Sequence, residues 1–274
     1  MLKQRVITAC VMMLSFLILL FLSPWQVFFF CTTMLFVVGA WEWSRLSGLT
    51  SHLSRIVYVC VLSLVGAAVL IGSSFGKNSA VLEPILIVAC LWWALAFIWI
   101  RLFPVGESLI RSRTVRLIVG SFVLIPSWLS ISYLIQLNAG ALIVLLGLLI
   151  VAAVDVGAYF TGRKFGKRKL APVVSPGKSW EGVWGGLAFT VLVGIVFVSV
   201  FGELDLAKLL LVLLPAALIS VVGDLLESMV KRICGVKDSG SLLPGHGGVL
   251  DRIDGLVSAI PVFTLAILLS NWTL

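Results

Sequence analysis

The stretch AKLLLVLLPAALISVVGDL, residues 207–225, decides the fold of this chain. It is apolar almost throughout, and its one acidic residue, Asp224, stands beside its end. A helix needs about 20 mostly apolar residues to cross the hydrocarbon core of a bilayer. We therefore expect these residues to form a transmembrane helix.

Similar apolar stretches occur along the whole chain. We place eight more at residues 6–22, 25–40, 56–74, 84–100, 117–135, 138–157, 184–202 and 254–271. The sequence is 61% hydrophobic and only 12% charged, with a mean hydropathy of +1.17. A water-soluble domain of 274 residues needs far less apolar surface, so the bilayer must be the solvent. The predicted fold class is all-α: a polytopic integral membrane protein with about nine transmembrane helices.

The two halves of the chain differ in chemistry. Residues 1–135 have few charges inside the apolar stretches and no chemical motif, so we interpret them as scaffold, whereas residues 138–274 contain nearly all the candidate catalytic motifs. We find no internal repeat, which counts against a secondary transporter built from inverted halves. We expect a single membrane domain over residues 1–274.

The basic residues predict the orientation of the helices. With a cytoplasmic N-terminus, 18 of the 20 Lys and Arg residues fall in loops on the cytoplasmic side, and only Lys77 and Lys208 fall outside. Membrane proteins retain positive charge in their cytoplasmic loops. We therefore expect the N-terminus inside and the C-terminus outside. The same rule explains the net charge of +8, so we expect no nucleic-acid partner. A single polytopic chain without appended domains suggests a bacterial inner membrane, with the polar motifs facing the cytoplasm.

The longest polar segment follows the opening stretch. Residues 228–254 read SMVKRICGVKDSGSLLPGHGGVLDRID, and such polar density in an apolar chain suggests a site for phosphate held with a metal ion. If the helix of residues 207–225 continues, Asp224, Ser228 and Lys231 share one face. Asp251 and Asp254 likewise share a face at the start of the last span. Two carboxylates from separate helices would suit magnesium. Alternatively, Asp224 pairs with Lys231 or Arg252 and only holds two helices together.

Several other side chains are candidates for binding phosphate. His246 lies between glycines that allow close approach to the main chain, whose N–H groups are suited to an anion nest, although it could equally be a plain loop residue. Lys178, in a Pro-Gly turn, and Asp155, at the end of the sixth span, are further candidates, with topology or helix packing as alternative roles. The cations that we expect to help bind phosphate, one or two of them serving only as topology anchors, are Lys231, Arg232, Lys237 and Arg252.

The pattern of residues 228–254 resembles the signature of the phosphatidate cytidylyltransferases, also called CDP-diacylglycerol synthases. The matching positions are Ser228, Lys231, Arg232, Lys237, Asp238, Gly240, Leu243, Pro244, His246, Gly247, Gly248, Asp251, Arg252 and Asp254. The resemblance implies a polytopic membrane protein that converts CTP and phosphatidic acid to CDP-diacylglycerol and pyrophosphate. It also implies a magnesium requirement, a potassium ion at the site and a homodimer. By the same resemblance Asp224 and Asp251 hold the metal, while Ser228 and Lys231 support it.

The reaction implied by the resemblance suits these residues. The phosphate of the lipid is already anionic, so no protein nucleophile is needed; the protein has to position two polyanions and neutralise charge. We assign the catalytic work to Asp224, Asp251, Lys231 and His246. The residues expected to bind substrate are Lys178, Ser228, Arg232, Lys237, Arg252, Asp254 and Asp155. A transporter or flippase for an anionic lipid, or a related lipid CTP-transferase with another acceptor, is the alternative.

Overall fold

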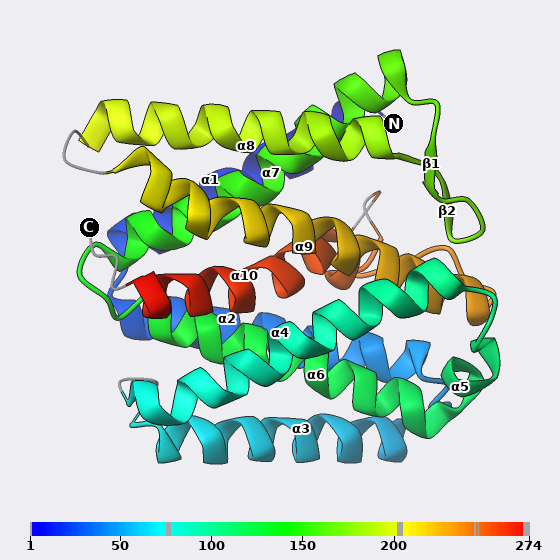
Figure 1. Cartoon of the computed structure of the whole chain (residues 1–274). Helices are drawn as coiled ribbons and strands as arrows, with labels where there is room; N and C mark the ends of the chain where they lie inside the picture. Colours follow the sequence, from blue (N-terminus) through cyan, green and yellow to red (C-terminus); the bar gives the residue numbers. More distant parts are fainter. Residues whose placement is uncertain (1, 75–77, 202–204, 244, 246, 271–274) are drawn as a thin grey trace.

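The computed structural model describes residues 2–74, 78–201, 205–243, 245 and 247–270, with side chains from residue 11 onward (Figure 1). Most of this part of the chain is helical. The helices are α1 (Leu2–Leu22), α2 (Trp25–Leu46), α3 (His52–Gly72), α4 (Ser79–Leu102), α5 (Glu107–Arg111), α6 (Arg113–Leu134), α7 (Gly140–Phe165), α8 (Trp180–Phe201), α9 (Leu206–Ile233) and α10 (Leu250–Ser270). Strands β1 (Lys169–Ala171) and β2 (Ser175–Ser179) form a small hairpin between α7 and α8.

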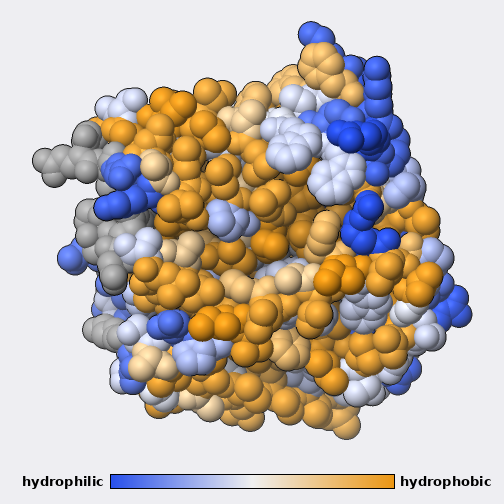
Figure 2. Space-filling model, viewed as in Figure 1, coloured by the Kyte–Doolittle hydropathy of each residue, from blue (hydrophilic) through white to orange (hydrophobic). Residues whose placement is uncertain are grey.

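All nine expected apolar segments are helices. Eight are long and apolar enough to cross a membrane, and α1 contributes a shorter apolar helix over Val11–Leu22 within the described side chains. Large hydrophobic side chains are exposed on the outside of the bundle, Leu64, Leu91 and Leu211 among them. Figure 2 shows apolar residues over most of the visible face, with hydrophilic residues gathered mainly at its ends. The prediction of a polytopic, helical membrane protein is therefore confirmed.

Three helices extend beyond their apolar stretches. The helices α2, α7 and α9 end at Leu46, Phe165 and Ile233, six to eight residues past the predicted boundaries at 40, 157 and 225. Their last turns contain Arg or Lys, which favour the negative end of the helix dipole. The boundaries were misplaced because hydropathy marks where the apolar part ends, whereas a helix continues as long as its backbone hydrogen bonds do.

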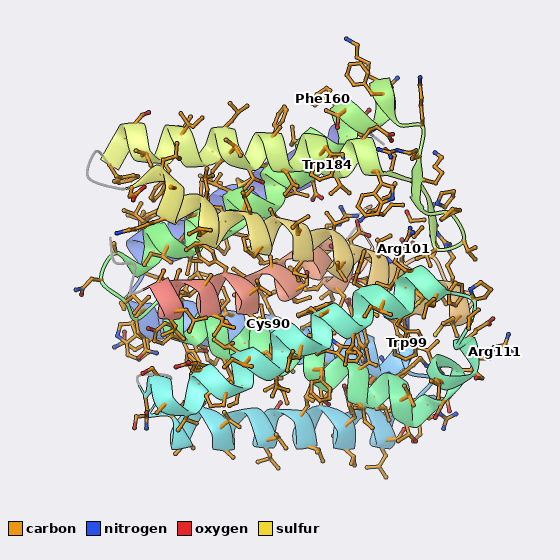
Figure 3. The ribbon with its side chains drawn as sticks, in the orientation of Figure 1. Cys90, Trp99, Arg101, Arg111, Phe160 and Trp184 are labelled. Atoms are coloured by element: carbon orange, nitrogen blue, oxygen red, sulfur yellow. The ribbon has the colours of Figure 1, made fainter. Side chains whose placement is uncertain are left out.

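The hairpin was not predicted by the all-helical interpretation. Its strands pair antiparallel, with Lys169 opposite Ser179 and Ala171 opposite Ser175. Pro172 and Pro176 disfavour a helix in this segment. Arg101, at the end of α4, fastens the hairpin to the bundle: its Nη1 donates to the carbonyl of Leu170 at 2.7 Å. Figure 3 shows Arg101 beside the hairpin.

Helix α9 is central to the bundle and packs against α4, α7, α8 and α10. Its closest approach to α10 is at Gly223, where an added methyl group would overlap the Oγ of Ser258 and the carbonyl oxygen of Asp254. The pair α7 and α8 is equally close, because Gly157 lies against the backbone of Gly185. These small residues bring the acidic positions of α7, α9 and α10 near one another.

The start of α1 and the end of α10 lie at opposite ends of the bundle (Figure 1). The hairpin, α5 and the connection from α9 to α10 all lie at the end where α1 starts. If α1 crosses a membrane together with the eight longer helices, the start of α1 and the end of α10 lie on opposite sides, as the predicted topology requires. We call the end with the hairpin the polar end.

Candidate active site

Charged side chains from four elements converge inside the polar end. Helix α7, strand β2, helix α9 and helix α10 each contribute, and hydrogen bonds, ion pairs or electrostatic interactions link the side chains to one another. We call this group the charged cluster: Asp155, Lys178, Asp224, Glu227, Lys231, Asp251 and Asp254.

The outer part of the charged cluster is built on Asp224. Its Oδ2 lies 2.5 Å from Nζ of Lys178, and its Oδ1 accepts a hydrogen bond from the Oγ of Ser228 at 3.2 Å. About a third of the Asp224 side chain and a quarter of the Lys178 side chain remain exposed. The bond between Asp224 and Ser228 confirms that α9 continues and that these residues share a face. Asp224 therefore combines a fixed position with access for a ligand.

The inner part of the charged cluster joins α9 to α10. Nζ of Lys231 lies 2.8 Å from Oδ1 of Asp251 and 3.3 Å from Oε1 of Glu227. The side chains of Glu227 and Asp251 are only 4% and 6% exposed, so Lys231 neutralises charge that water scarcely reaches. The interhelical ion pair that we had considered for Asp224 is thus made by Asp251. Glu227 was not predicted, although its spacing of four residues from Lys231 favours such a pair.

Asp251 also organises the connection between α9 and α10. Its Oδ2 accepts hydrogen bonds from the backbone N–H of Ser239 at 2.9 Å, the Oγ of Ser239 at 3.0 Å and the backbone N–H of Gly248 at 2.8 Å. Gly247 has φ +85°, and a Cβ there would press against the Asp251 carboxylate. We expected backbone N–H groups near His246 to form a nest for phosphate; the one on Gly248 binds Asp251 instead.

Asp254 and Asp155 complete the charged cluster. Asp254 of α10 and Asp155 of α7 each lie within electrostatic range of Asp224 and Lys178. Asp155 and Lys178 also line a cavity of about 370 Å³ between α7, α8, α9 and β2. Tyr159 and Arg163 of α7 line the same cavity. The guanidinium of Arg163 donates a hydrogen bond to the phenol oxygen of Tyr159 at 2.9 Å.

The cavity lies beside a face suited to lipid. The exposed aromatic side chains of Phe160, on α7, and Trp184, on α8, point outward next to it (Figure 3). Aromatic rings of this kind favour the boundary between hydrocarbon and head groups. The cavity therefore has a charged inner wall and an apolar, aromatic surround.

The remaining candidates lie outside the charged cluster. Nε of Arg232 donates to the carbonyl of Val174 at 3.4 Å, which braces the turn of the hairpin. Lys237 and Arg252 are exposed at the surface of the polar end. His246 falls outside the described residues, so its predicted role stays a prediction. Of the residues proposed from the sequence, the structure thus brings together Asp155, Lys178, Asp224, Ser228, Lys231, Asp251 and Asp254.

The donor chemistry of the charged cluster suits a magnesium ion. Within the described part of the chain, no three His, Cys, Asp or Glu residues are arranged as a ready metal site. Mg²⁺, however, commonly binds through one or two carboxylates, with substrate phosphates and water filling its other positions. Asp224 is the accessible carboxylate of α9, and Asp155 of α7 is exposed as well; Asp251 has its oxygens on four protein donors and could join only if Lys231 moved from Oδ1. The assignment of Mg²⁺ to Asp224 and Asp251 remains a prediction.

Sequence reasoning missed a contribution from the half of the chain interpreted as scaffold. Glu42 of α2 is buried, and its carboxylate accepts hydrogen bonds from the backbone N–H groups of Val249 and Leu250. The signal was present, because an acidic residue beside an apolar stretch is costly and commonly functional. It was overlooked because residue 42 lay past the predicted end of its span.

Comparisons with known proteins place the chain in a family. The model of the cytidylyltransferase family matches residues 3–270. The chain belongs to the cytidylyltransferase family. It is 41% identical to a phosphatidate cytidylyltransferase of Pseudomonas aeruginosa, over 99% of each chain. It is 37% identical to a phosphatidate cytidylyltransferase of Haemophilus influenzae, over 96% of this chain and 98% of the relative. The family resemblance drawn from residues 228–254 is therefore confirmed, and it extends to the helices of the first half.

A third relative matches a shorter part of the chain. A phosphatidate cytidylyltransferase of Brucella suis is 47% identical over 116 residues, which is 42% of this chain and 43% of the relative.

Proposed function

We propose that this protein transfers the cytidylyl group of CTP to phosphatidate, giving CDP-diacylglycerol and pyrophosphate. The observation that carries the proposal is the charged cluster, in which Lys178, paired with the accessible Asp224, lines a cavity beside an apolar, aromatic surface. Such a position allows a water-borne polyanion and a lipid phosphate to meet. Membership of the cytidylyltransferase family and the names of the relatives support this reaction over transport of an anionic lipid.

The reaction is a displacement at phosphorus. An oxygen of the lipid phosphate forms a bond to the α-phosphorus of CTP, and the bond from that phosphorus to the bridging oxygen of the β-phosphate breaks, so that pyrophosphate leaves. The nucleophile is the substrate's own phosphate. The protein therefore acts by holding the two groups in line and by stabilising charge that develops on the leaving group.

The charged cluster supplies that positioning. We assign Lys178 to a phosphate of one substrate, because it lines the cavity and is held by Asp224 rather than buried. We assign Lys231 to the inner side, where it neutralises Glu227 and Asp251 and keeps the start of α10 against α9. Ser228 fixes the Asp224 carboxylate. Asp155 and Asp254 both interact electrostatically with Lys178, and Asp254 also interacts with Lys231.

Mg²⁺, when bound, would supply positive charge that stabilises the phosphates as negative charge develops on the leaving group. We propose Asp224 and Asp251 as its protein ligands, with a potassium ion nearby as a further proposal from the family resemblance. Arg232, Lys237, Arg252 and His246 are proposed to help bind the phosphates of the substrates. The exposed positions of Arg232, Lys237 and Arg252 at the polar end support a role in docking the head group more than a role at the reacting phosphorus.

We further propose that the polar end faces the cytoplasm of a bacterial inner membrane, and that the protein forms a homodimer. The bacterial relatives and the accumulation of Lys and Arg in the loops of the polar end support the first proposal. CTP is made in the cytoplasm, so a site at that face would have direct access to it.

The proposed function is tested with purified protein in detergent or in vesicles. CTP labelled at the α-phosphate, phosphatidate and Mg²⁺ should together give labelled CDP-diacylglycerol and an equal amount of pyrophosphate. Omitting phosphatidate should abolish pyrophosphate release, which excludes simple hydrolysis of CTP. Movement of label across a vesicle membrane without formation of CDP-diacylglycerol would favour a transporter and contradict the proposal.

A further inference from the structure

Glu42 is a buried acid that no role in the reaction explains so far. It lies near the end of α2 and is only 5% exposed. Its Oε1 accepts a hydrogen bond from the backbone N–H of Val249 at 3.0 Å, and its Oε2 accepts one from the backbone N–H of Leu250 at 2.9 Å. The Oγ of Ser239 lies 3.1 Å from the same Oε2. Every one of these donors belongs to the connection from α9 to α10 or to the first residue of α10.

The contacts make Glu42 a cap supplied from another helix. The first N–H groups of a helix have no acceptor within it, and they carry the positive end of the helix dipole. A carboxylate at this place satisfies two such groups of α10 at once. Without it, two buried donors would be left unpaired, which is costly.

Ser239 connects Glu42 to Asp251. Its Oγ lies 3.1 Å from Oε2 of Glu42 and 3.0 Å from Oδ2 of Asp251. A hydroxyl has a single hydrogen to donate, so the two carboxylates share it, while the backbone N–H of Ser239 binds Asp251 independently. The orientation of Asp251 and the position of Glu42 are therefore coupled through one side chain.

The fit around Glu42 leaves little room for another arrangement. A methyl group added at Gly240 would overlap the Glu42 carboxylate, and one added at Gly248 would lie 2.6 Å from Oε2. Two glycines in the connection thus allow its backbone to close over the buried acid. The end of α2 holds the connection at a second point, where Nη2 of Arg45 donates to the carbonyl of Asp238 at 3.3 Å.

We infer that Glu42 is a positioning residue for cytidylyl transfer. It holds the connection and the start of α10 against α2, and through Ser239 it orients Asp251 and the Lys231 ammonium that Asp251 binds. It touches none of the reacting phosphates itself. The inference rests on the proposed function, because it assigns to the charged cluster the work that Glu42 supports.

The test compares Glu42→Gln with Glu83→Gln. Glu83 lies near the start of α4, at the other end of the bundle, and controls for loss of an acid from an apolar helix. Glutamine keeps the shape of Glu42 but turns an NH₂ group toward a backbone N–H. We expect kcat per folded molecule to fall about 10- to 100-fold in Glu42→Gln, as for residues that orient reacting groups, with the KM values for CTP and phosphatidate little changed. Glu83→Gln should match the wild type.

A double-mutant cycle with Ser239→Ala tests the path. If Glu42 acts through Ser239, the double variant should lose about as much kcat as the worse single variant, because residues of one network are not additive. The inference would be overturned if the loss of kcat in the double variant equalled the product of the losses in the two single variants. It would also be overturned if Glu42→Gln had the kcat of the wild type per folded molecule. Where Glu42→Gln gives no folded protein, Ser239→Ala decides alone, and a kcat within about threefold of the wild type overturns it.

The same experiment separates this inference from the proposed function. Wild-type and Glu83→Gln preparations that form no CDP-diacylglycerol would remove the proposed function, and this inference with it. An active wild type with an unaffected Glu42→Gln would remove the positioning role alone.

Discussion

At the scale of residues, two adjacent cations on α9 have different surroundings. Neighbouring positions on a helix point about 100° apart, and α9 continues through both Lys231 and Arg232 to Ile233. Lys231 lies between Glu227 and Asp251 inside the charged cluster, whereas Arg232 reaches the hairpin. The sequence alone predicts that the side chains of Lys231 and Arg232 point in different directions, but only the structure identifies the residues that each contacts.

We predict different kinetic defects for the two cations. Lys231→Ala should lower kcat by about 10- to 100-fold, because it removes the cation that orients Asp251 and holds the start of α10 against α9. Arg232→Ala should mainly raise KM for phosphatidate, because it loosens the hairpin beside the cavity. Kinetics with CTP and phosphatidate varied separately check this. Equal losses of kcat in both variants would contradict the assignment.

Removal of Lys231 has a structural consequence that the measurement has to separate. It leaves two carboxylates of low exposure without their cation, a change that costs about 3–5 kcal/mol of stability in other buried pairs. Activities are therefore expressed per folded molecule after size-exclusion chromatography. Lys231→Arg, which keeps the charge, should retain more stability than Lys231→Ala.

At the scale of elements, the contact between α9 and α10 positions the charged cluster. Asp224 follows Gly223 directly, and the carbonyl of Asp254 lies against that glycine. We predict that Gly223→Ala lowers stability by about 1–3 kcal/mol, because a methyl group there overpacks the interface. It should also reduce kcat, since it separates the two helices that contribute most of the charged cluster.

Thermal unfolding in detergent checks this prediction, with Gly72→Ala as the control. Gly72 ends α3, and an added methyl group there meets nothing within 4 Å. Its Tm and kcat should equal those of the wild type. A Gly223→Ala variant as stable and active as Gly72→Ala would mean that α9 and α10 are not in such close contact.

What the sequence could predict follows from how local each signal is. Nine apolar stretches predicted nine helices, because hydropathy over about 20 residues is a local property. The shared face of Asp224 and Ser228 was also predictable, since helical periodicity fixes it once α9 continues. The ends of α7 and α9 were not predictable from hydropathy. Both helices continue past their apolar stretches into the polar layer, and hydropathy does not mark where a helix ends within that layer.

Contacts between distant segments were out of reach of the same reasoning. The pair Lys178–Asp224 joins a hairpin that was not predicted to a helix, and the cap of α10 by Glu42 spans more than 200 residues of sequence. Asp251 was identified as important, yet its partner Lys231 was expected to bind phosphate rather than this carboxylate. Periodicity predicts which side chains of one element share a face, but it does not predict which side chains of another element they contact.

At the scale of the whole molecule, the bundle separates a polar end from an apolar surround. The hairpin, the connection from α9 to α10 and the start of α1 lie together, while α10 ends at the far side (Figure 1). The loops of the polar end have most of the Lys and Arg residues, so this end is predicted to be cytoplasmic.

We predict that the C-terminus lies outside the cytoplasm. A reporter that is active only in the cytoplasm should be silent when fused after Leu274. The same reporter fused within the connection from α9 to α10, after Lys237, should be active and serves as the matched control. Activity of the C-terminal fusion would mean an even number of crossings and an error in the assignment of the loops.

The account as a whole depends on the charged cluster being the place of cytidylyl transfer. Asp224→Asn tests this most directly, because it removes the accessible carboxylate while keeping its shape and its bond from Ser228. The measurement is the rate of CDP-diacylglycerol formation from CTP and phosphatidate with Mg²⁺ varied, per folded molecule. We predict less than about a tenth of wild-type activity at every Mg²⁺ concentration, in a variant that elutes as the wild type does. A folded Asp224→Asn protein with more activity than this would contradict the account.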